Sequence, residues 1–343
     1  MFTDQLFAAI SQKTKESMST STLVQQAVQF LNEARKKVIS PSDISVQELL
    51  QAILDYAPCD TGRRFAACAI IGAAEAVGSE AEHEDMGRAE RLALLARDWL
   101  KFVLWPVKSA HRLCLSRHSS MSSAGLTEIQ HVSATGRKRQ DEFTRKVKKR
   151  EAGRCAVTSR RNIPAAAHFI RPPIYAENEP EIFHRTITWD ILRLYAGLPD
   201  ECTENPEKFL RSPANGMYLN PEMRKTFDRF YWYLLPLDEP NTYRYVPLHE
   251  DMDDAVPAHR TLVTFSDHSG LGIALPHPRL VGLHAALTRV LHHTGTGEFF
   301  DRMFDRYLGE DHDLAAPVGK FCGDDLELRM ALLAVLDEEV SSV

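Results

Sequence analysis

Two stretches of the chain, at 154–173 and 215–236, constrain its fold more than any other feature. The first reads RCAVTSRRNIPAAAHFIRPP and predicts a short hairpin, with a strand at Cys155–Thr158, a turn, and a second strand that ends at His168. The second reads NGMYLNPEMRKTFDRFYWYLLP and predicts an Asn-Gly turn, a short apolar run, a short helix that ends near Asp228, and an aromatic strand. The pattern indicates an α+β fold, with a small ββα module embedded in a mostly helical protein.

This order of motifs resembles the HNH nuclease fold, the ββα-metal finger, and in particular the HNH domain of many fungal proteins. The resemblance covers 137–237, and more weakly 270–305. It implies a phosphodiester-hydrolysing endonuclease in which His168 is the general base that takes a proton from the attacking water. Imidazole suits this role because its unperturbed pKa of about 6.5 lets it accept a proton near neutral pH. The resemblance also implies that Asn215 holds the His168 ring by a hydrogen bond. The alternative is that this residue simply forms an Asn-Gly turn, and both can be true at once.

In the family a divalent cation neutralises the charge that develops on the phosphate. Both usual ligand positions are degenerate here. Arg224 stands where the family has a histidine, and alanines precede His168 where many members have an acid. A guanidinium cannot coordinate a cation, and its charge repels one. Magnesium or zinc is therefore expected only if other side chains compensate, and the candidates for that are Asp228, Glu222, His184 and Asp190.

Three functional hypotheses remain open, because one fold can support all of them. The first is a nuclease pocket made of His168, Asn215, Arg224 and Asp228. In that pocket the Arg224 fork replaces the charge of the metal and clamps a phosphate directly. The second is a metal-independent derivative that has lost phosphodiester hydrolysis, either a binding module or an enzyme in which His168, Arg224 and Asp228 perform acid–base chemistry on a small molecule. The third is a structural or partner-binding protein.

The strongest charge feature is RKRQDEFTRKVKKREAGR at 137–154, with nine Lys or Arg against three acids. As a helix it carries a basic face next to the arginines of the predicted hairpin turn. Phosphate contacts of nucleic acid are assigned to Arg145, Lys148, Lys149, Arg160 and Arg161. The alternative is a solvated helix that leads into the hairpin. Because the net charge of the 343-residue chain is −6, nucleic-acid binding requires such a local patch.

The region 1–106 is predicted to be helical. Ser45 and Glu48 form a capping-box pattern at the start of one helix, and the segment 63–76 is apolar almost all round. Pro106 is expected to end the last helix. This bundle is interpreted as a scaffold, with a partner or dimerisation surface as the alternative.

The segment 107–136 contains seven serines and is predicted to be a linker or long loop. Its histidines at 111, 118 and 131 fit no metal motif and are interpreted as surface residues. The module at 137–240 contains an insertion, 174–212, which is predicted to be a lid or wall over the site, or a decoration that extends the core.

The C-terminal part, 241–343, is predicted to hold strands at 242–248 and 259–267, separated by an acidic turn interpreted as solvated. A helix follows near 278–293 with a leucine stripe. A final helix at 324–340 is expected to pack on the core, or to mediate a homodimer.

The sequence contains no run of 18 or more apolar residues and no basic leader before an apolar run, so neither a membrane span nor a secretory signal is predicted. The six cysteines are scattered without a C-x-x-C pair, which disfavours a cysteine-type zinc site. Reduced thiols indicate an intracellular protein, cytoplasmic or nuclear.

Overall fold

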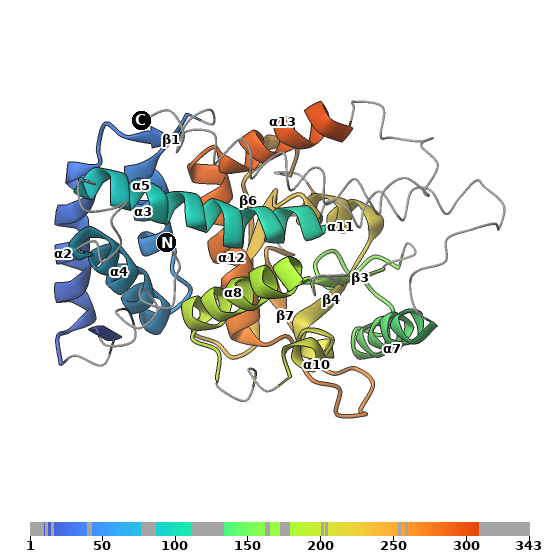
Figure 1. The fold of residues 1–343 in the computed structure, drawn as a ribbon. Helices are drawn as coiled ribbons and strands as arrows, with labels where there is room; N and C mark the ends of the chain where they lie inside the picture. The colour runs from blue at the N-terminus through green and yellow to red at the C-terminus, as the bar shows by residue number, and fades with distance from the viewer. Residues whose placement is uncertain are drawn as a thin grey trace.

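A computed structural model describes residues 10, 13–14, 17–39, 43–76, 87–111, 134–161, 165–171, 179–199, 202, 205–252, 255–257 and 260–308. These residues form the predicted α+β fold, in which helices predominate and the sheets are small and antiparallel (Figure 1). The histidines at 118 and 131 and the predicted final helix at 324–340 lie outside the described residues.

The N-terminal region forms a helical bundle on one side of the molecule (Figure 1). Ser45 accepts a hydrogen bond from the backbone N–H of Glu48 at 3.2 Å, which confirms the predicted cap. Gly62 allows α4 to approach α8 closely, because a Cβ there would overlap the carbonyl oxygen of Tyr195. The elements of this region are α2 (Thr20–Glu33), β1 (Val38–Ile39), β2 (Ile44–Ser45), α3 (Val46–Asp55), α4 (Asp60–Glu75) and α5 (Arg88–Trp99).

The helix that contains α5 does not end at Pro106, contrary to the prediction. It passes through a π-helical turn (Leu100–Leu104) and continues as an α-helix over 105–111. In this turn the N–H of Trp105 bonds to the carbonyl of Leu100, five residues earlier. A proline ring clashes with the carbonyl four residues before it in a regular helix, and the wider turn directly precedes Pro106. The extension turns part of the predicted linker into a rigid, buried helix end.

The described part of the insertion does not form a lid. Its helices are α8 (Glu179–Ala196) and α10 (Pro206–Leu210). On α8 the side chains of Ile187, Ile191 and Tyr195 are buried in the main core, and the Tyr195 hydroxyl donates to the carbonyl of Ile53 at 2.7 Å. This described part of the insertion therefore extends the core toward the N-terminal bundle.

A strand–strand–helix unit lies at the opposite side of the molecule from α2 (Figure 1). It consists of β3 (Ala165–His168), β4 (Gly216–Leu219) and α11 (Pro221–Asp228), and a 3-10 turn (Pro213–Asn215) precedes β4. β3 pairs with β4 in antiparallel register, with His168 opposite Gly216. The predicted hairpin is wrong in one respect. Cys155–Thr158 is a turn, and the partner of the His168 strand comes after the insertion.

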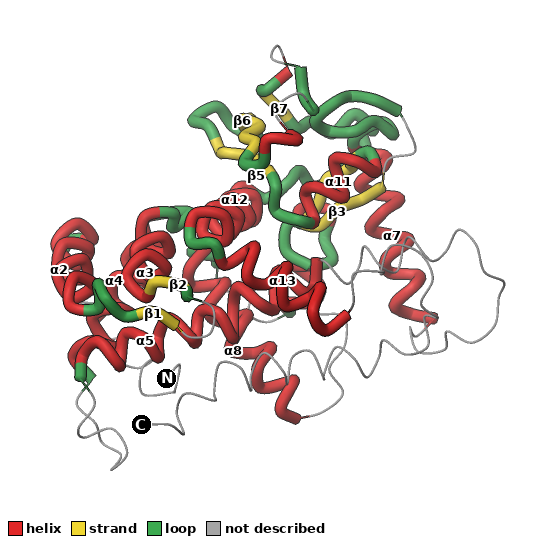
Figure 2. The backbone as a smooth tube through the Cα atoms, turned by 90° about the horizontal axis from the view of Figure 1, so that it is seen from above, coloured by secondary structure: helices red, strands yellow, loops and turns green. Residues whose placement is uncertain are grey.

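The remaining strands form an antiparallel sheet in the order β5, β6, β7. Figure 2 shows α12 between this sheet on one side and α8 on the other. The predicted leucine stripe of α12, at Leu280, Leu283, Leu287 and Leu291, is buried. The elements are β5 (Trp232–Pro236), β6 (Thr242–Pro247), a 3-10 turn (Glu250–Met252), β7 (Leu262–Thr264), α12 (Pro278–His293) and α13 (Thr296–Leu308).

One hydrophobic cluster runs from the N-terminal bundle through β4 and α11 to α13. A second, small cluster of Phe143, Val147, Ala166 and Tyr218 attaches α7 (Ala134–Arg150) to the β3–β4 pair. Within the described ranges, no helix is long and apolar enough to cross a membrane.

Candidate functional site

The helix α11 directs charged side chains into the protein. Its first turn is capped by Asn220, whose side chain accepts from the N–H of Met223 at 2.8 Å. Arg224 and Asp228 are one turn apart and lie on the same buried face as Phe227. The Nε atom of Arg224 lies 3.5 Å from Oδ2 of Asp228. Two of the predicted site residues are therefore an internal ion pair.

The Asp228 carboxylate is the centre of a buried network. Its Oδ2 accepts from Nη2 of Arg171 at 2.8 Å, and its Oδ1 lies 3.0 Å from Nδ1 of His111. A buried carboxylate needs such partners because it has lost its hydration. Burial alone would raise the pKa of Asp228, but the Arg171 guanidinium and the His111 hydrogen bond outweigh it and hold this pKa well below its usual value. Asp228 is ionised at all physiological pH values.

His111 belongs to this network although the sequence indicated a surface residue. It ends the helical segment 105–111, and its ring is fully buried next to Phe230, with ring centroids 5.0 Å apart. Burial lowers the pKa of His111, against the opposing effect of Asp228. The ring is therefore neutral and donates from Nδ1, because an ionised carboxylate can only accept. Only the amphipathic continuation of the helix past Pro106 could have indicated this position.

His168 is placed at the end of β3, as predicted, but it is buried and only 3% exposed. The ring of Phe143 stacks on it, with centroids 3.9 Å apart and planes at 8°. Burial is the main cause that lowers the pKa of His168 well below its usual value, and the positive charges of Arg171 and Arg224 act in the same direction. A neutral imidazole accepts a proton in the plane of its ring, but the burial of His168 leaves an attacking water little access to it.

Asn215 does not hold the His168 ring. Its Oδ1 accepts from the N–H of Ile170 at 3.0 Å, and its Nδ2 donates to the carbonyls of Ile170 and Leu210 at 2.6 and 2.7 Å. Both N–H donors of the amide are used by these carbonyls. Asn215 therefore fixes the backbone just after β3, and it positions His168 and Arg171 through the chain rather than by direct contact.

The side chains around Asp228 do not fit a divalent cation. Both oxygens of the carboxylate are engaged by His111 and Arg171, and the Arg224 guanidinium adds a second positive charge. Of the compensating candidates, Glu222 is exposed on the first turn of α11, and the side chain of residue 184 lies outside the described part of the chain. Among the described residues, no group of three or more His, Cys, Asp or Glu is arranged to hold a metal ion.

The residues predicted to contact phosphate are all exposed. Arg145, Lys148 and Lys149 lie on the outer face of α7, while Phe143 and Val147 attach its inner face to β3 and β4. Arg160 and Arg161 are exposed in the loop that precedes β3. The exposed cations of α7 thus lie on its outer face, whereas His168 packs against Phe143 on the inner face of this helix, so these cations and His168 do not form one pocket.

No protein-family model matches the chain, and neither the curated proteins nor the solved structures contain a match. The arrangement itself offers two chemical capabilities. The exposed cations of α7 and its following loop can bind an anion, and the buried network holds β3, α11 and the N-terminal helix together.

Proposed function

We propose that this protein binds nucleic acid through the outer face of α7 and the loop after it, on an HNH-like ββα scaffold that works without a metal ion. The resemblance to HNH domains at 137–237 supports the scaffold. One observation carries the binding function. The five predicted phosphate ligands are all exposed, although the chain as a whole is acidic.

The electrostatics favour a polyanion at this surface. Lysine and arginine side chains bind phosphates and release condensed counterions, so each contact adds affinity that falls with salt. Among the described side chains of α7, from position 142 onward, the exposed ion pair joins Lys146 to Glu142 at 2.7 Å and leaves the other exposed cations of this half free of it. The side chains of Arg145, Lys148 and Lys149 remain directed to solvent on the same helix.

Two features argue against retained metal-dependent hydrolysis. The Asp228 carboxylate bonds to Arg171 and His111, and Arg224 occupies the family's histidine position. His168 lies under Phe143, away from the exposed face of α7. In this proposal the ion pairs of Asp228 stabilise the ββα unit in place of a metal, and His168 is a core residue.

A small-molecule enzyme has less support. That hypothesis predicts a closed, partly apolar pocket around His168. Two surface clefts, of about 440 and 190 Å³, are lined by residues other than His168, Arg224 and Asp228. We include an intracellular location, cytoplasmic or nuclear, in the same proposal. Nucleic-acid binding agrees with such a location.

The test is binding of fluorescent single- and double-stranded oligonucleotides, with and without a metal chelator. We expect binding that weakens steeply with salt, is unchanged by chelator and is accompanied by no strand cleavage. Chelator-sensitive cleavage that disappears in His168→Ala would restore the nuclease hypothesis. The proposal would be contradicted if neither the single-stranded nor the double-stranded oligonucleotides bound at low salt.

A further inference from the structure

An exposed leucine stands at the tip of the loop that follows β7. The side chain of Leu271 is 65% exposed, more than any other large apolar side chain that the structure describes. The residues on either side, Gly270 and Gly272, have φ of 66° and 67°, a left-handed backbone that favours glycine. A Cβ at either glycine would meet no atom of the described chain within 4 Å beyond its neighbours in sequence. The tip therefore extends into solvent and carries one apolar side chain between two residues that have none. Figure 1 shows the loop, in orange, extending below α7.

Hydrogen bonds to Asp267 fix the shape of this loop. Its Oδ1 accepts from the backbone N–H of Ser269 at 3.0 Å and from the Ser269 hydroxyl at 2.6 Å, and its Oδ2 accepts from the N–H of Ile273 at 2.9 Å. The N–H of Leu271 donates to the Ser269 hydroxyl at 3.2 Å. A preorganised loop loses less conformational entropy when it binds a partner, so the loop presents Leu271 to a partner at little cost.

Both ends of the loop are attached to the last residue of α7. The N–H of His268 donates to the carbonyl of Arg150 at 2.9 Å, and Nη1 of Arg150 donates to the carbonyl of Ala274 at 2.7 Å. Arg150 is fully buried, and its Nη2 is paired with the Glu151 carboxylate at 2.7 Å. Leu271 is therefore held in a fixed place relative to α7, the helix whose outer face carries proposed phosphate ligands.

Exposed cations lie next to the base of the loop. A cleft of about 190 Å³ is lined by Arg154, from the turn after α7, and by Ser266 and His268, from the base of the loop. Arg154 is exposed, and so are Arg160 and Arg161 in the segment that follows this turn. A phosphate backbone that these cations hold therefore passes beside the loop that carries Leu271.

We propose that Leu271 is an apolar wedge that enters a base step of duplex DNA held by these cations and kinks the duplex there. Proteins that bend DNA insert leucine and similar apolar side chains between base steps, and the bent duplex then contacts more of the protein surface. The inference rests on the proposed function, and it makes duplex DNA the preferred partner. An unpaired strand bends freely, so the wedge gains nothing on it.

An anionic membrane suits the same loop less well. Insertion of Leu271 would have to supply most of the apolar contact, and even a whole myristoyl chain gives only marginal, reversible membrane binding. A leucine side chain is much smaller than that chain. On duplex DNA the phosphate contacts supply the affinity, and the wedge only has to open one base step.

The experiment measures energy transfer between dyes at the two ends of a duplex of about 20 base pairs that has a flexible TA step at its centre. The wild type is expected to raise the transfer efficiency when it binds, because a kink brings the ends closer. Leu271→Ala should leave the transfer near that of the free duplex and bind this duplex about fivefold more weakly. It should keep the salt dependence of the wild type and its affinity for single strands. Leu271→Met, which keeps a long apolar side chain, should retain the increase in transfer.

Leu262→Ala is the matched control, because Leu262 is 59% exposed on β7 and does not line the cleft, and it should behave as the wild type. If the wild type bound the duplex without raising the transfer, or if Leu271→Ala raised it fully, the wedge would be overturned and the proposed function would stand. Binding of neither duplex nor single strands would overturn both. Vesicles made of equal parts of phosphatidylcholine and phosphatidylserine form a second arm. Vesicle binding that Leu271→Ala abolishes, with DNA bending unchanged, would overturn the wedge in favour of a membrane contact.

Discussion

The Nδ1 atom of His111 lies 3.0 Å from Oδ1 of Asp228, although 117 positions separate the two residues in the chain. This hydrogen bond joins the end of the N-terminal helical region to α11 of the ββα unit. The buried contact explains why the helix of α5 must continue past Pro106. It also makes the N-terminal region part of the structure that positions Arg171 and Arg224.

Removal of this contact should destabilise the protein. We expect His111→Ala to lower the free energy of unfolding by about 3 kcal/mol, because the buried Asp228 carboxylate loses a hydrogen bond and the ring leaves a cavity. Urea unfolding measures this loss. His292→Ala is the control, since His292 is exposed at the end of α12, and its effect should be within about 0.5 kcal/mol. Equal effects of the two substitutions would refute the role of His111.

The Asp228 network also predicts acid sensitivity. The folded protein holds the pKa of Asp228 below its unfolded value, so the stabilisation is present above about pH 4 and is lost as the pH falls below it. Asp228→Asn should lower the free energy of unfolding by about 3 to 5 kcal/mol near pH 7. The gap between wild type and variant should narrow in urea unfolding at about pH 3. A gap that is constant across this range would mean that the Asp228 charge does not stabilise the fold.

Phe143 is expected to control the protonation of His168. Phe143→Ala removes the ring that covers the imidazole and should lower the free energy of unfolding by about 3 kcal/mol. Because burial is the largest cause of the low pKa of His168, this pKa should rise toward about 6.5. NMR titration of the histidine ring protons measures the shift. Val147→Ala, in the same small cluster, is the control and should leave the pKa of His168 unchanged.

Much of the fold could be predicted because the local signals and the tertiary packing agree. The Ser45 cap, the aromatic strand at β5 and the leucine stripe of α12 depend only on local sequence. The strand expected at Cys155–Thr158 failed because β-propensity depends on an available partner strand. Its neighbour Ser159 has a left-handed backbone with φ of 58°, which ends an extended segment.

The candidate site could be predicted in part. His168, Arg224 and Asp228 were indicated by their motifs, and α11 does bring Arg224 and Asp228 together. The network around them depends on long-range contacts that no spacing reveals. His111 lies beyond a proline, and the role of Asn215 became clear only from its bonds to the backbone of Ile170.

Glu151 predicts a second pH effect, of opposite sign. Its pKa is raised by burial to about 7 in the folded protein, so the folded state favours the protonated carboxyl over the ionised one. The stability that this group contributes is therefore fully present below about pH 4, the unfolded pKa, and is lost as the pH rises through 7. The free energy of unfolding of the wild type should fall by up to about 3 kcal/mol between about pH 5 and 8. The groups that face Glu151 are Arg150, Arg154, Tyr218 and His268.

Glu151→Gln cannot ionise, so the fall in stability with rising pH should be absent in that variant. His268→Ala is the control, and its free energy of unfolding should fall with rising pH as that of the wild type does. If the wild type and Glu151→Gln show parallel pH profiles in urea unfolding, Glu151 is not the titrating group.

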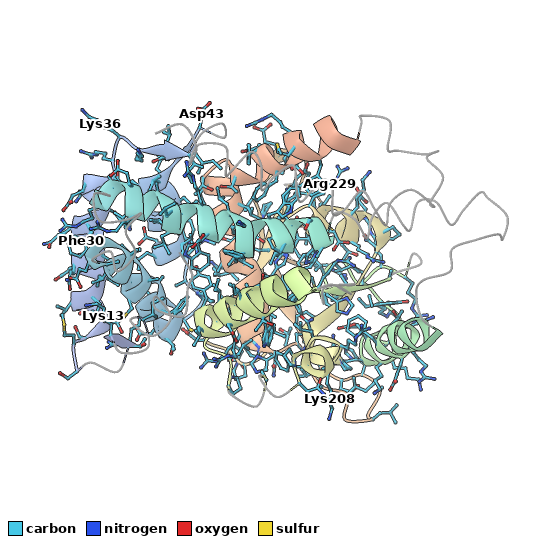
Figure 3. All side chains as sticks on the ribbon, viewed as in Figure 1. Lys13, Phe30, Lys36, Asp43, Lys208 and Arg229 are labelled. Carbon is cyan, nitrogen blue, oxygen red and sulfur yellow. The ribbon has the colours of Figure 1, made fainter. Side chains whose placement is uncertain are left out.

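The salt dependence of oligonucleotide binding, measured by fluorescence anisotropy in the presence of a chelator, tests the central claim most directly. The triple variant Arg145→Ala/Lys148→Ala/Lys149→Ala should bind more weakly than the wild type. Its slope of log affinity against log salt should be smaller by about 2 to 3, roughly one for each phosphate contact. The control Arg35→Ala/Lys36→Ala/Lys37→Ala removes the same charge at the far side of the molecule, where Figure 3 labels Lys36. The account predicts that this control behaves as the wild type, whereas equal slopes for the wild type and both triple variants would contradict it.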